Sequence, residues 1–451
     1  MSAVAPSSLI GSSALVSIVT TDLAAVTRGR PLTEARYRKS LETGVGWVPA
    51  NQCLTAFNTI ADPNPWGSSG DLRIVPDEAA RYATAATGAA TRFDMVMGDI
   101  VELDGTPWMA CARTQLRAAL RALEAATGLS LVATFEQEFT LVPGAAGAPV
   151  QPLHAFSVEA LRHFDPFAPR LSACLEEAGV EPEMVLAEYG ANQFEITHAP
   201  TDGLTAADRA VAIREITREV ARVAGARASF APKPALDQVG NGVHIHFSLR
   251  DMTGQPATFD AARPGRLSQA AGAFCAGILR HLPGILALTA SGVPSYYRLA
   301  PHNWSSSYTW LGERDREATL RICPTVTIGG RDPERQFNIE YRAADATANP
   351  YLALAAIVRA GLAGLEADLA APPIVGGDPS VMSEDERERL GLRRLPETLE
   401  EALVAMAANP VVTSWFAPEL LASFVAVKRS EIGLMAGLDR AAVCAAYGAR
   451  Y

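Results

Sequence analysis

Several segments of the chain alternate between hydrophobic and polar residues, and a period of two is typical of β-strands. Valine, isoleucine, phenylalanine and threonine are frequent in these segments, which strengthens the interpretation. The pattern predicts strands at residues 131–141, 185–197, 244–249, 319–322 and 337–342.

Other segments have the helical period and carry recognisable start and stop signals. One helix is expected to open near Arg113 and to end at Gly128, because glycine readily adopts the left-handed conformation after a last turn. Another is expected to start at Pro350, directly behind the capping residue Asn349. The helix that starts at Pro350 is expected to extend to residue 369. Further helices are predicted at residues 205–224, at residues 266–288 and in the C-terminal third.

The first 105 residues differ from the rest, since short apolar runs alternate there with turn residues, including a Pro- and Gly-rich loop at 62–71. Strands and helices then mix without regular alternation. We therefore expect an α+β protein with a small strand-rich domain at residues 1–105 and a large domain at 106–451. In the large domain, helices should surround an antiparallel sheet, and residues 371–397 should form a surface excursion.

Composition narrows the class of protein. Of 451 residues, 49% are hydrophobic, and the net charge of −10 argues against a nucleic-acid partner. Six cysteines without paired spacing indicate reduced, mostly core thiols. The N-terminus lacks the basic and apolar segments of a signal peptide. The longest apolar helix candidate, 351–369, is interrupted by charges and is expected in the core. These features predict a cytoplasmic protein without a membrane partner.

Polar residues occur in pairs at i and i+2 on the predicted strands, and such pairs share one face of a sheet. Any single pair would be best explained as a solvated sheet face. Several pairs, each flanked by large apolar residues that face the other way, indicate the floor of a polar site, because unpaired charges are costly to bury. The pairs are Glu136 with Glu138, Gln193 with Glu195, His244 with His246, and Glu340 with Arg342.

Carboxylates joined by one or two imidazoles suit Mg²⁺ or Mn²⁺ better than zinc. Arginines beside such ions commonly bind phosphates and carboxylates, and the candidates are Arg298, Arg316, Arg321 and Arg342. The sequence contains no Walker A motif and no GxGxxG. Metals with arginines but without a P-loop indicate phosphoryl transfer on a different scaffold.

An ordered set of motifs runs from about residue 71 to the C-terminal helices: EQEF, EYGANQFE, FAPKP, GNGVHIHFSL, YYRLAP, REATLRICP and NIEYRAADATANPYLA. This set resembles the glutamine synthetase superfamily of the class I type. Within the superfamily it is most similar in character to the branch of γ-glutamyl polyamine and monoamine ligases. The resemblance implies an N-terminal β-grasp domain, a catalytic domain with a curved antiparallel sheet, and two stacked hexameric rings. It also implies that ATP activates a carboxylate as an acyl phosphate, which an amine then attacks.

The resemblance assigns roles to matching positions. The metal that holds the substrate carboxylate would be bound by Glu138, Glu188 and Glu195. The second metal, beside the ATP phosphates, would be bound by Glu136, His244 and Glu340. Residues beside the nucleotide would be His246 and Ser248, together with Arg316 and Arg321, which stabilise the transferred phosphoryl group. The acid substrate would be bound by Arg298 and Arg342 next to Gly240, and Arg342 would also act in catalysis.

Three positions depart from the pattern of ammonia-using members of the superfamily. Trp304 stands where those members have a glutamate that binds ammonium, and Phe156 stands where they usually have a tyrosine. Val239 replaces an asparagine before Gly240. The first two departures imply a less anionic, more apolar amine pocket, since an aromatic ring packs on carbon and lacks a carboxylate. Val239 leaves open whether the acid is glutamate.

Three functions follow from the sequence. The expected one is γ-glutamylation of an organic amine, and the first alternative is a glutamine synthetase that uses ammonia. The second alternative is an inactive, ring-forming relative, against which the retained set of charged residues argues. An N-terminal aspartate expected at the subunit interface is either Asp62 or Asp71. The sequence specifies neither the amine nor the ring size.

Overall fold

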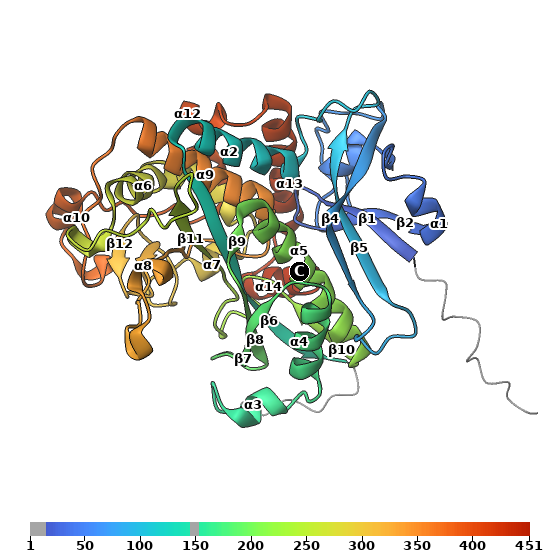
Figure 1. The fold of residues 1–451 in the computed structure, drawn as a ribbon, viewed down its shortest axis with the longest axis horizontal. Coiled ribbons are helices and arrows are strands. Elements are labelled where there is room, and N and C mark those ends of the chain that lie inside the picture. Colours follow the sequence, from blue (N-terminus) through green and yellow to red (C-terminus); the bar gives the residue numbers. More distant parts are fainter. Residues whose placement is uncertain (1–14, 145–152) are drawn as a thin grey trace, which may run out of the picture.

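The computed structural model describes residues 15–144 and 153–451 and contains two sheets (Figure 1). The N-terminal sheet has five strands in the order β2-β1-β5-β4-β3, with β1 and β5 parallel and the other pairs antiparallel. A short helix, α1 (Glu34–Arg38), and a 3₁₀ turn, η1 (Pro49–Cys53), connect its strands. The strands are β1 (Leu15–Thr21), β2 (Thr27–Thr33), β3 (Val45–Trp47), β4 (Leu72–Thr84) and β5 (Phe93–Val101).

The second sheet has nine strands and is curved, with β6 and β11 crossing its centre (Figure 1). Its main path is β12-β13-β14-β11-β6-β8-β7, while β9 and β10 also pair with β6. All neighbours are antiparallel except β12 and β13 at one edge. The strands are β6 (Ser130–Pro143), β7 (Pro182–Ala187), β8 (Gln193–His198), β9 (Thr201–Asp202), β10 (Ala226–Ser229), β11 (Val243–Arg250), β12 (Leu311–Glu313), β13 (Leu320–Ile322) and β14 (Ile339–Tyr341).

Four long helices form the buried scaffold: α2 (Ala112–Thr127), α5 (Gly203–Val223), α6 (Gln269–Thr289) and α9 (Pro350–Glu366). Helix α9 packs against α2, α5 and α6. Its approach to α6 requires glycine, because a Cβ on Gly277 would lie 2.2 Å from the carbonyl oxygen of Ala360. This scaffold, together with the sheets, confirms the predicted α+β class.

Shorter helices cover the edges of the molecule. They are α3 (Val158–Arg162), α4 (Phe167–Glu177), α7 (Ser295–Arg298), α8 (Pro333–Gln336), α10 (Glu384–Leu390), α11 (Leu399–Ala407), α12 (Pro410–Thr413), α13 (Pro418–Met435) and α14 (Arg440–Gly448). Three further 3₁₀ turns occur at η2 (Pro264–Arg266), η3 (Ile328–Gly330) and η4 (Pro379–Val381).

The alternation along β6 separates a core face from a polar face. Phe135 and Phe139 are buried, and the Phe139 ring lies 5.8 Å from that of Phe194 on β8 and 6.1 Å from that of Phe167 on α4. This aromatic cluster holds one face of the sheet against the helices. The charged residues between these phenylalanines are therefore directed to the other face.

Helix α6 is the one helix in the described part of the chain that is long and apolar enough to cross a membrane. However, 83% of its most apolar window is buried inside the molecule, where it packs on α9 and α11. It is a core helix. It corresponds to the helix predicted at 266–288, and with 21 residues it is longer than α9, with 17, which the sequence marked as the longest apolar helix candidate.

Two predicted elements need correction. The single strand expected at 185–197 is two antiparallel strands, β7 and β8, joined by a turn that contains Glu188 and in which Asn192 has a φ of +56°. Residues 371–397 are not merely a surface excursion. Val375 and Leu392 pack with Trp310 and Ala318 in a second, small hydrophobic core.

Candidate active site

One face of the nine-stranded sheet collects the polar residues that the sequence places at i and i+2. Directly opposed residues on neighbouring strands point to the same face, so the register decides which side chains meet. The four central strands β14, β11, β6 and β8 therefore share one polar floor. Its cross-strand pairs are His246 with Glu340, His244 with Glu136, and Glu138 with Glu195.

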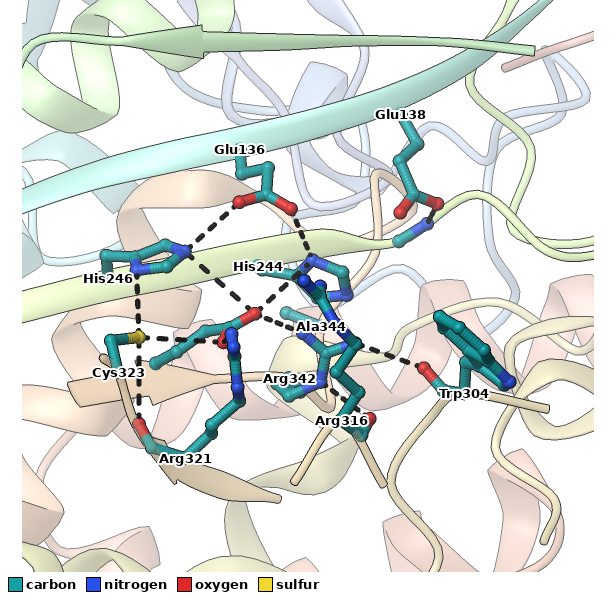
Figure 2. A network of polar contacts seen from close by, with 12 residues as sticks. Glu136, Glu138, His244, His246, Trp304, Arg316, Arg321, Cys323, Arg342 and Ala344 are labelled. Atoms are coloured by element: carbon teal, nitrogen blue, oxygen red, sulfur yellow. Dashed lines mark hydrogen bonds and ion pairs between the residues drawn. The ribbon is translucent and has the colours of Figure 1, made fainter. Parts of the chain in front are cut away.

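Three of these residues converge on one point of the floor. The Nδ1 atom of His244 lies 2.9 Å from Oε1 of Glu136 and 3.6 Å from Oε1 of Glu340 (Figure 2). Ligand atoms around an octahedral magnesium ion are separated by about 2.9 to 4.2 Å. The ligand atoms of Glu136, Glu138 and His244 all lie within 4.8 Å of one another, so these three residues have the chemistry and the spacing for one divalent ion, and Glu340 borders them through His244.

A second group of carboxylates lies next to the first. Glu138 accepts a hydrogen bond from the backbone N–H of Gly242 at 2.7 Å and lies opposite Glu195 in the ladder. The side-chain amide of Gln193 approaches Glu138 at 3.4 Å. Glu188, in the turn between β7 and β8, is close enough that its charge raises the pKa of both Glu138 and Glu195. The structure therefore brings together the three carboxylates proposed for the other metal.

Burial and the neighbouring negative charges raise the pKa values of this second group. Burial raises the pKa of Glu138 to about 7, and the negative charge of Glu136 adds to the effect. Burial also raises the pKa of Glu188, and it raises that of Glu195 far above its ordinary value. For Glu340 burial is outweighed by Arg342 and the two histidines, which lower its pKa to about 2. A bound cation would stabilise the ionised form of the carboxyl groups whose pKa values are raised.

Four arginines surround the floor. Nη1 of Arg321 donates to Oε2 of Glu340 at 2.7 Å, and Arg342 donates to Oε1 of the same carboxylate. Arg298 is buried and donates to the carbonyl of Ala344 at 2.6 Å. The Nε atoms of Arg298 and Arg321 have no hydrogen-bond partner among the described residues. An unpaired buried donor costs about 1–3 kcal/mol, so both atoms are positioned for oxygens of a ligand.

Arg316 lies in the loop before β13 and points toward the floor beside Arg342 (Figure 2). Its charge lowers the pKa of Glu188, against the larger effect of burial. Its carbonyl oxygen accepts a hydrogen bond from Nε of Arg342 at 2.9 Å. The backbone at Arg316 therefore also helps to fix the Arg342 guanidinium.

Gly240 is needed for the position of Arg298. A Cβ at Gly240 would lie 2.5 Å from Cγ of Arg298 and 2.6 Å from the carbonyl of Pro232. The carbonyl of Gly240 accepts a hydrogen bond from Nε2 of Gln193 at 2.9 Å. The buried Asn241 side chain also accepts from Gln193, at 2.9 Å, and ties the segment to β6 and β10.

Trp304 belongs to a loop that is bound directly to the site. Its carbonyl accepts a hydrogen bond from Nη2 of Arg342 at 3.1 Å (Figure 2). The Glu317 carboxylate accepts from the backbone N–H groups of Trp304, at 2.7 Å, and of His302, at 3.2 Å. Both residues have positive φ, +64° for His302 and +52° for Trp304, and the indole is 69% exposed. The loop is thus held in an unusual conformation with a free aromatic ring.

Phe156 is less closely tied to the polar floor. It also has a positive φ, +58°, and an exposed ring. The preceding residues, His154 and Ala155, line a small pocket together with Glu188. The backbone before Phe156 therefore borders the carboxylate group, while the place of its ring in an amine pocket stays a prediction.

Beyond His246 the polar face of β11 continues into a cavity of about 280 Å³. Ser248 and Arg250 lie in its lining, together with Arg335 and Phe337. Residues 244, 246, 248 and 250 alternate onto one face, so this cavity continues the polar floor. Ser248, which the resemblance places beside the nucleotide, thus lies in a cavity that continues the polar floor.

Two residues near the floor were missed by the sequence analysis. Sγ of Cys323 lies 3.7 Å from Nδ1 of His246 and 3.8 Å from Oε2 of Glu340, so this buried free cysteine, expected only as a core thiol, also borders the polar floor. The i+2 spacing from Arg321 could have revealed it. Glu317, by contrast, acts on a loop whose course no sequence pattern predicts.

Comparison with known proteins agrees with this architecture. The family model for the glutamine synthetase N-terminal domain matches residues 4–108, and that for the glutamine synthetase catalytic domain matches residues 109–438. The gamma-glutamylpolyamine synthetase of Streptomyces coelicolor is 35% identical over 95% of this chain and 92% of its own. The type-1 glutamine synthetase 1 of Dictyostelium discoideum is 31% identical over 74% of this chain and 69% of its own.

Solved structures give the same result. A crystal structure described as a novel glutamine synthase homolog superposes with a TM-score of 0.90 at 43% identity, covering all of both chains. A complex of GmaS with ADP superposes with a TM-score of 0.80 at 25% identity over 95% of each chain. The chain belongs to the glutamine synthetase family, whose members use ATP and divalent metals, and it is a ligase that forms carbon–nitrogen bonds.

Proposed function

We propose that this ligase joins the side-chain carboxylate of glutamate to an organic amine, with ATP as co-substrate. The observation that carries the proposal is the loop of Trp304, whose carbonyl is bound by Arg342 at 3.1 Å. By the resemblance, Trp304 stands where ammonia-using members have an ammonium-binding glutamate, so its ring would lie in the amine pocket. The same feature separates the proposal from ammonia-dependent synthesis.

The polar floor provides two sets of ligands for Mg²⁺ or Mn²⁺. Glu136, His244 and Glu340 would hold the ion beside the ATP phosphates. Glu138, Glu188 and Glu195 would hold the ion beside the acid. Such ions neutralise negative charge on the phosphates and on the attacking carboxylate.

The arginines would bind and orient the two substrates. Arg298 and Arg342 would bind the carboxylates of the acid, with Arg298 seated against Gly240. Arg316 and Arg321 would stabilise the phosphoryl group during transfer, and His246 and Ser248 would border the nucleotide. All of these groups lie on one side of the same sheet, so both substrates can be held within reach of each other.

The reaction then has two steps. An oxygen of the acid attacks the terminal phosphorus of ATP, and the bond to the leaving ADP breaks, which forms an acyl phosphate. The amine nitrogen next attacks the acyl carbon, phosphate leaves with the C–O bonding electrons, and the nitrogen loses a proton. Activation makes phosphate the leaving group in place of oxide, which divides a difficult condensation into two feasible steps.

An organic amine fits the side chains near Trp304 better than ammonia does. Indole and phenyl rings bind carbon chains and cationic ammonium groups through their faces. The ring of Trp304 is exposed and available, and Phe156 is exposed on the segment beside Glu188. The similarity to a gamma-glutamylpolyamine synthetase supports the same substrate class.

Ammonia remains the second candidate substrate, because other similar proteins are glutamine synthetases. Replacing the aromatic ring tests this alternative. In Trp304→Glu, the restored carboxylate should improve the use of ammonia relative to organic amines. If the wild-type protein already prefers ammonia and Trp304→Glu changes nothing, the proposal for the amine is wrong.

The acyl phosphate can be tested separately with glutamate that carries ¹⁸O in its side-chain carboxylate. The phosphate released during amide formation should contain one labelled oxygen. Unlabelled phosphate formed at the same rate as the amide would contradict the intermediate. We further propose an assembly of two stacked hexameric rings, in which Asp62 or Asp71 of one subunit lies near the site of its neighbour.

A further inference from the structure

The Cys323 thiol is the one soft ligand among the hard carboxylates of the described polar floor. It is 6% exposed, and its sulfur forms a cluster with His246 and Glu340 in which all three ligand atoms lie within 4.8 Å of one another. From these residues we infer that the floor contains a site for a thiophilic divalent ion such as Zn²⁺, distinct from the magnesium positions. Neither the acid nor the amine needs to be known for this inference.

The distances match a tetrahedral zinc site. With Zn–S near 2.3 Å and Zn–N or Zn–O near 2.0–2.1 Å, the ligand atoms of a tetrahedron are about 3.4–3.6 Å apart. Sγ of Cys323 lies 3.7 Å from Nδ1 of His246 and 3.8 Å from Oε2 of Glu340. Small side-chain movements would therefore complete the coordination.

The surroundings of His246 also fit a metal ligand. Its Nε2 faces Oε2 of Glu136 at 3.1 Å, an arrangement in which a carboxylate orients a coordinating imidazole from the far side. Its Nδ1 faces both Cys323 and the amide oxygen of Asn338, the latter at 2.9 Å. Zinc at Nδ1 would replace the proton that this nitrogen shares with the Asn338 oxygen.

A simple thiol explains this convergence less well. A thiol is a weak donor with a single proton, whereas the sulfur of Cys323 faces His246, Glu340 and the carbonyl of Arg321. Arg321 also binds Oε2 of Glu340 at 2.7 Å and would offset the negative charge that a thiolate adds. Oε2 of Glu340 has lone pairs for both Arg321 and a metal ion.

Glu340 connects this site to the proposed magnesium position. Its Oε1 faces His244, and its Oε2 faces Cys323. A carboxylate shared in this way lets the two ions influence each other. Thiolate and imidazole ligands favour zinc over magnesium, so zinc should occupy the Cys323 position even in excess magnesium.

Cobalt provides a direct test, since Co²⁺ replaces Zn²⁺ and reports a bound thiolate through a near-ultraviolet charge-transfer band. Metal-free full-length protein should develop this band on titration with Co²⁺, and Zn²⁺ should remove it. Cys323→Ser should lack the band. Cys174→Ala, which alters another buried free cysteine, should keep it.

Zinc affinity, measured by competition with a chromogenic chelator, should fall about tenfold or more in Cys323→Ser. Cys323→Ala should give the same loss, and thermal unfolding of both metal-free variants should confirm that they fold. A wild-type protein without the cobalt band, or variants with unchanged zinc affinity, would overturn the inference. Because the test needs no turnover, its failure would leave the proposed ligase activity untouched.

Discussion

Single residues on the polar floor differ mainly in whether a cation already faces them. Glu340 is paired with Arg321 and Arg342, whereas Glu138 and Glu195 face other carboxylates. The first arrangement has its counter-charges within the chain, whereas the second is relieved by bound protons or by a bound metal. Metal binding and proton binding should therefore compete at Glu138 and Glu195.

This competition predicts a pH-dependent magnesium affinity. Burial raises the pKa of Glu138 to about 7, so below that pH the carboxyl is protonated and a metal must displace the proton. Affinity should rise as pH increases from 6 to 8, with a slope of up to about tenfold per pH unit for one released proton. Calorimetry in buffers of different ionisation enthalpy measures the released protons.

The control for this experiment is Glu138→Gln, which removes the titrating group. Its magnesium affinity should be weaker and should vary less with pH. If the wild-type affinity were constant between pH 6 and 8 and no protons were released, the electrostatic description of this group would be wrong.

A substitution at Gly240 should affect mainly the binding of the acid substrate. In Gly240→Ala the new methyl group would lie 2.5 Å from Cγ of Arg298, which must then move. The KM for the acid should rise by roughly ten- to a hundredfold, because small displacements of a positioning group are costly. The KM for ATP should change much less.

Gly46→Ala is the matched control, since a Cβ at Gly46 meets no atom within 4 Å. It should leave the kinetic constants unchanged. Equal effects of the two substitutions, or an unchanged KM for the acid in Gly240→Ala, would argue against Arg298 as the residue that binds the acid.

At the scale of elements, the strands were predictable because the i and i+2 rule links sequence directly to one face of a sheet. Glu136 and Glu138 on β6 and His244 and His246 on β11 follow it. The turn that divides 185–197 was missed because the apolar pattern continues on both sides of it, although Gly190 and Asn192 within it are turn-forming residues. The conformation of the loop at Trp304 could not be predicted for a different reason, because it depends on a tertiary contact with Glu317.

Glu317→Gln tests that contact. The substitution replaces one of the two carboxylate oxygens that accept from His302 and Trp304 with an NH₂ group, which cannot accept. Loss of one such hydrogen bond costs about 1–3 kcal/mol locally, so hydrogen exchange at 300–306 should accelerate. The KM for the amine should rise several-fold relative to that for ATP.

Glu313→Gln serves as the control on the neighbouring strand, because among the described residues the ion-pair partner of Glu313 is the partly buried Arg266, at 2.7 Å. It should leave exchange in the Trp304 loop unchanged. If Glu317→Gln behaved in the same way, the loop would be held by other contacts and Glu317 would not position it.

At the scale of the whole molecule, the N-terminal sheet is joined to the catalytic part through the buried side chain of Arg113. This guanidinium bonds to Asp208 on α5 at 2.8 Å, to Asp77 on β4 at 2.7 Å and to Asp99 on β5 at 3.1 Å. Tyr351 on α9 also donates to Asp208, at 2.7 Å. Five elements from both parts of the chain, α2 included, thus meet in one charge network.

Arg113→Ala should destabilise the protein strongly, because it leaves Asp208 buried without its partner. The expected loss is about 3–5 kcal/mol in the free energy of unfolding. Arg117→Ala, on the same helix, removes a half-exposed ion pair to Asp99 and should cost at most about 1 kcal/mol. Denaturant unfolding measures both, and equal losses would contradict a central role for Arg113.

The identity of the amine substrate is tested most directly by one measurement. Phosphate release from ATP would be followed with Mg²⁺ and glutamate while ammonia, monoamines and polyamines are supplied in turn, and the amide product would be identified by mass spectrometry. We predict release and a γ-glutamyl amide with at least one organic amine, and little release with ammonia. Efficient glutamine formation from ammonia, without turnover of organic amines, would contradict the account.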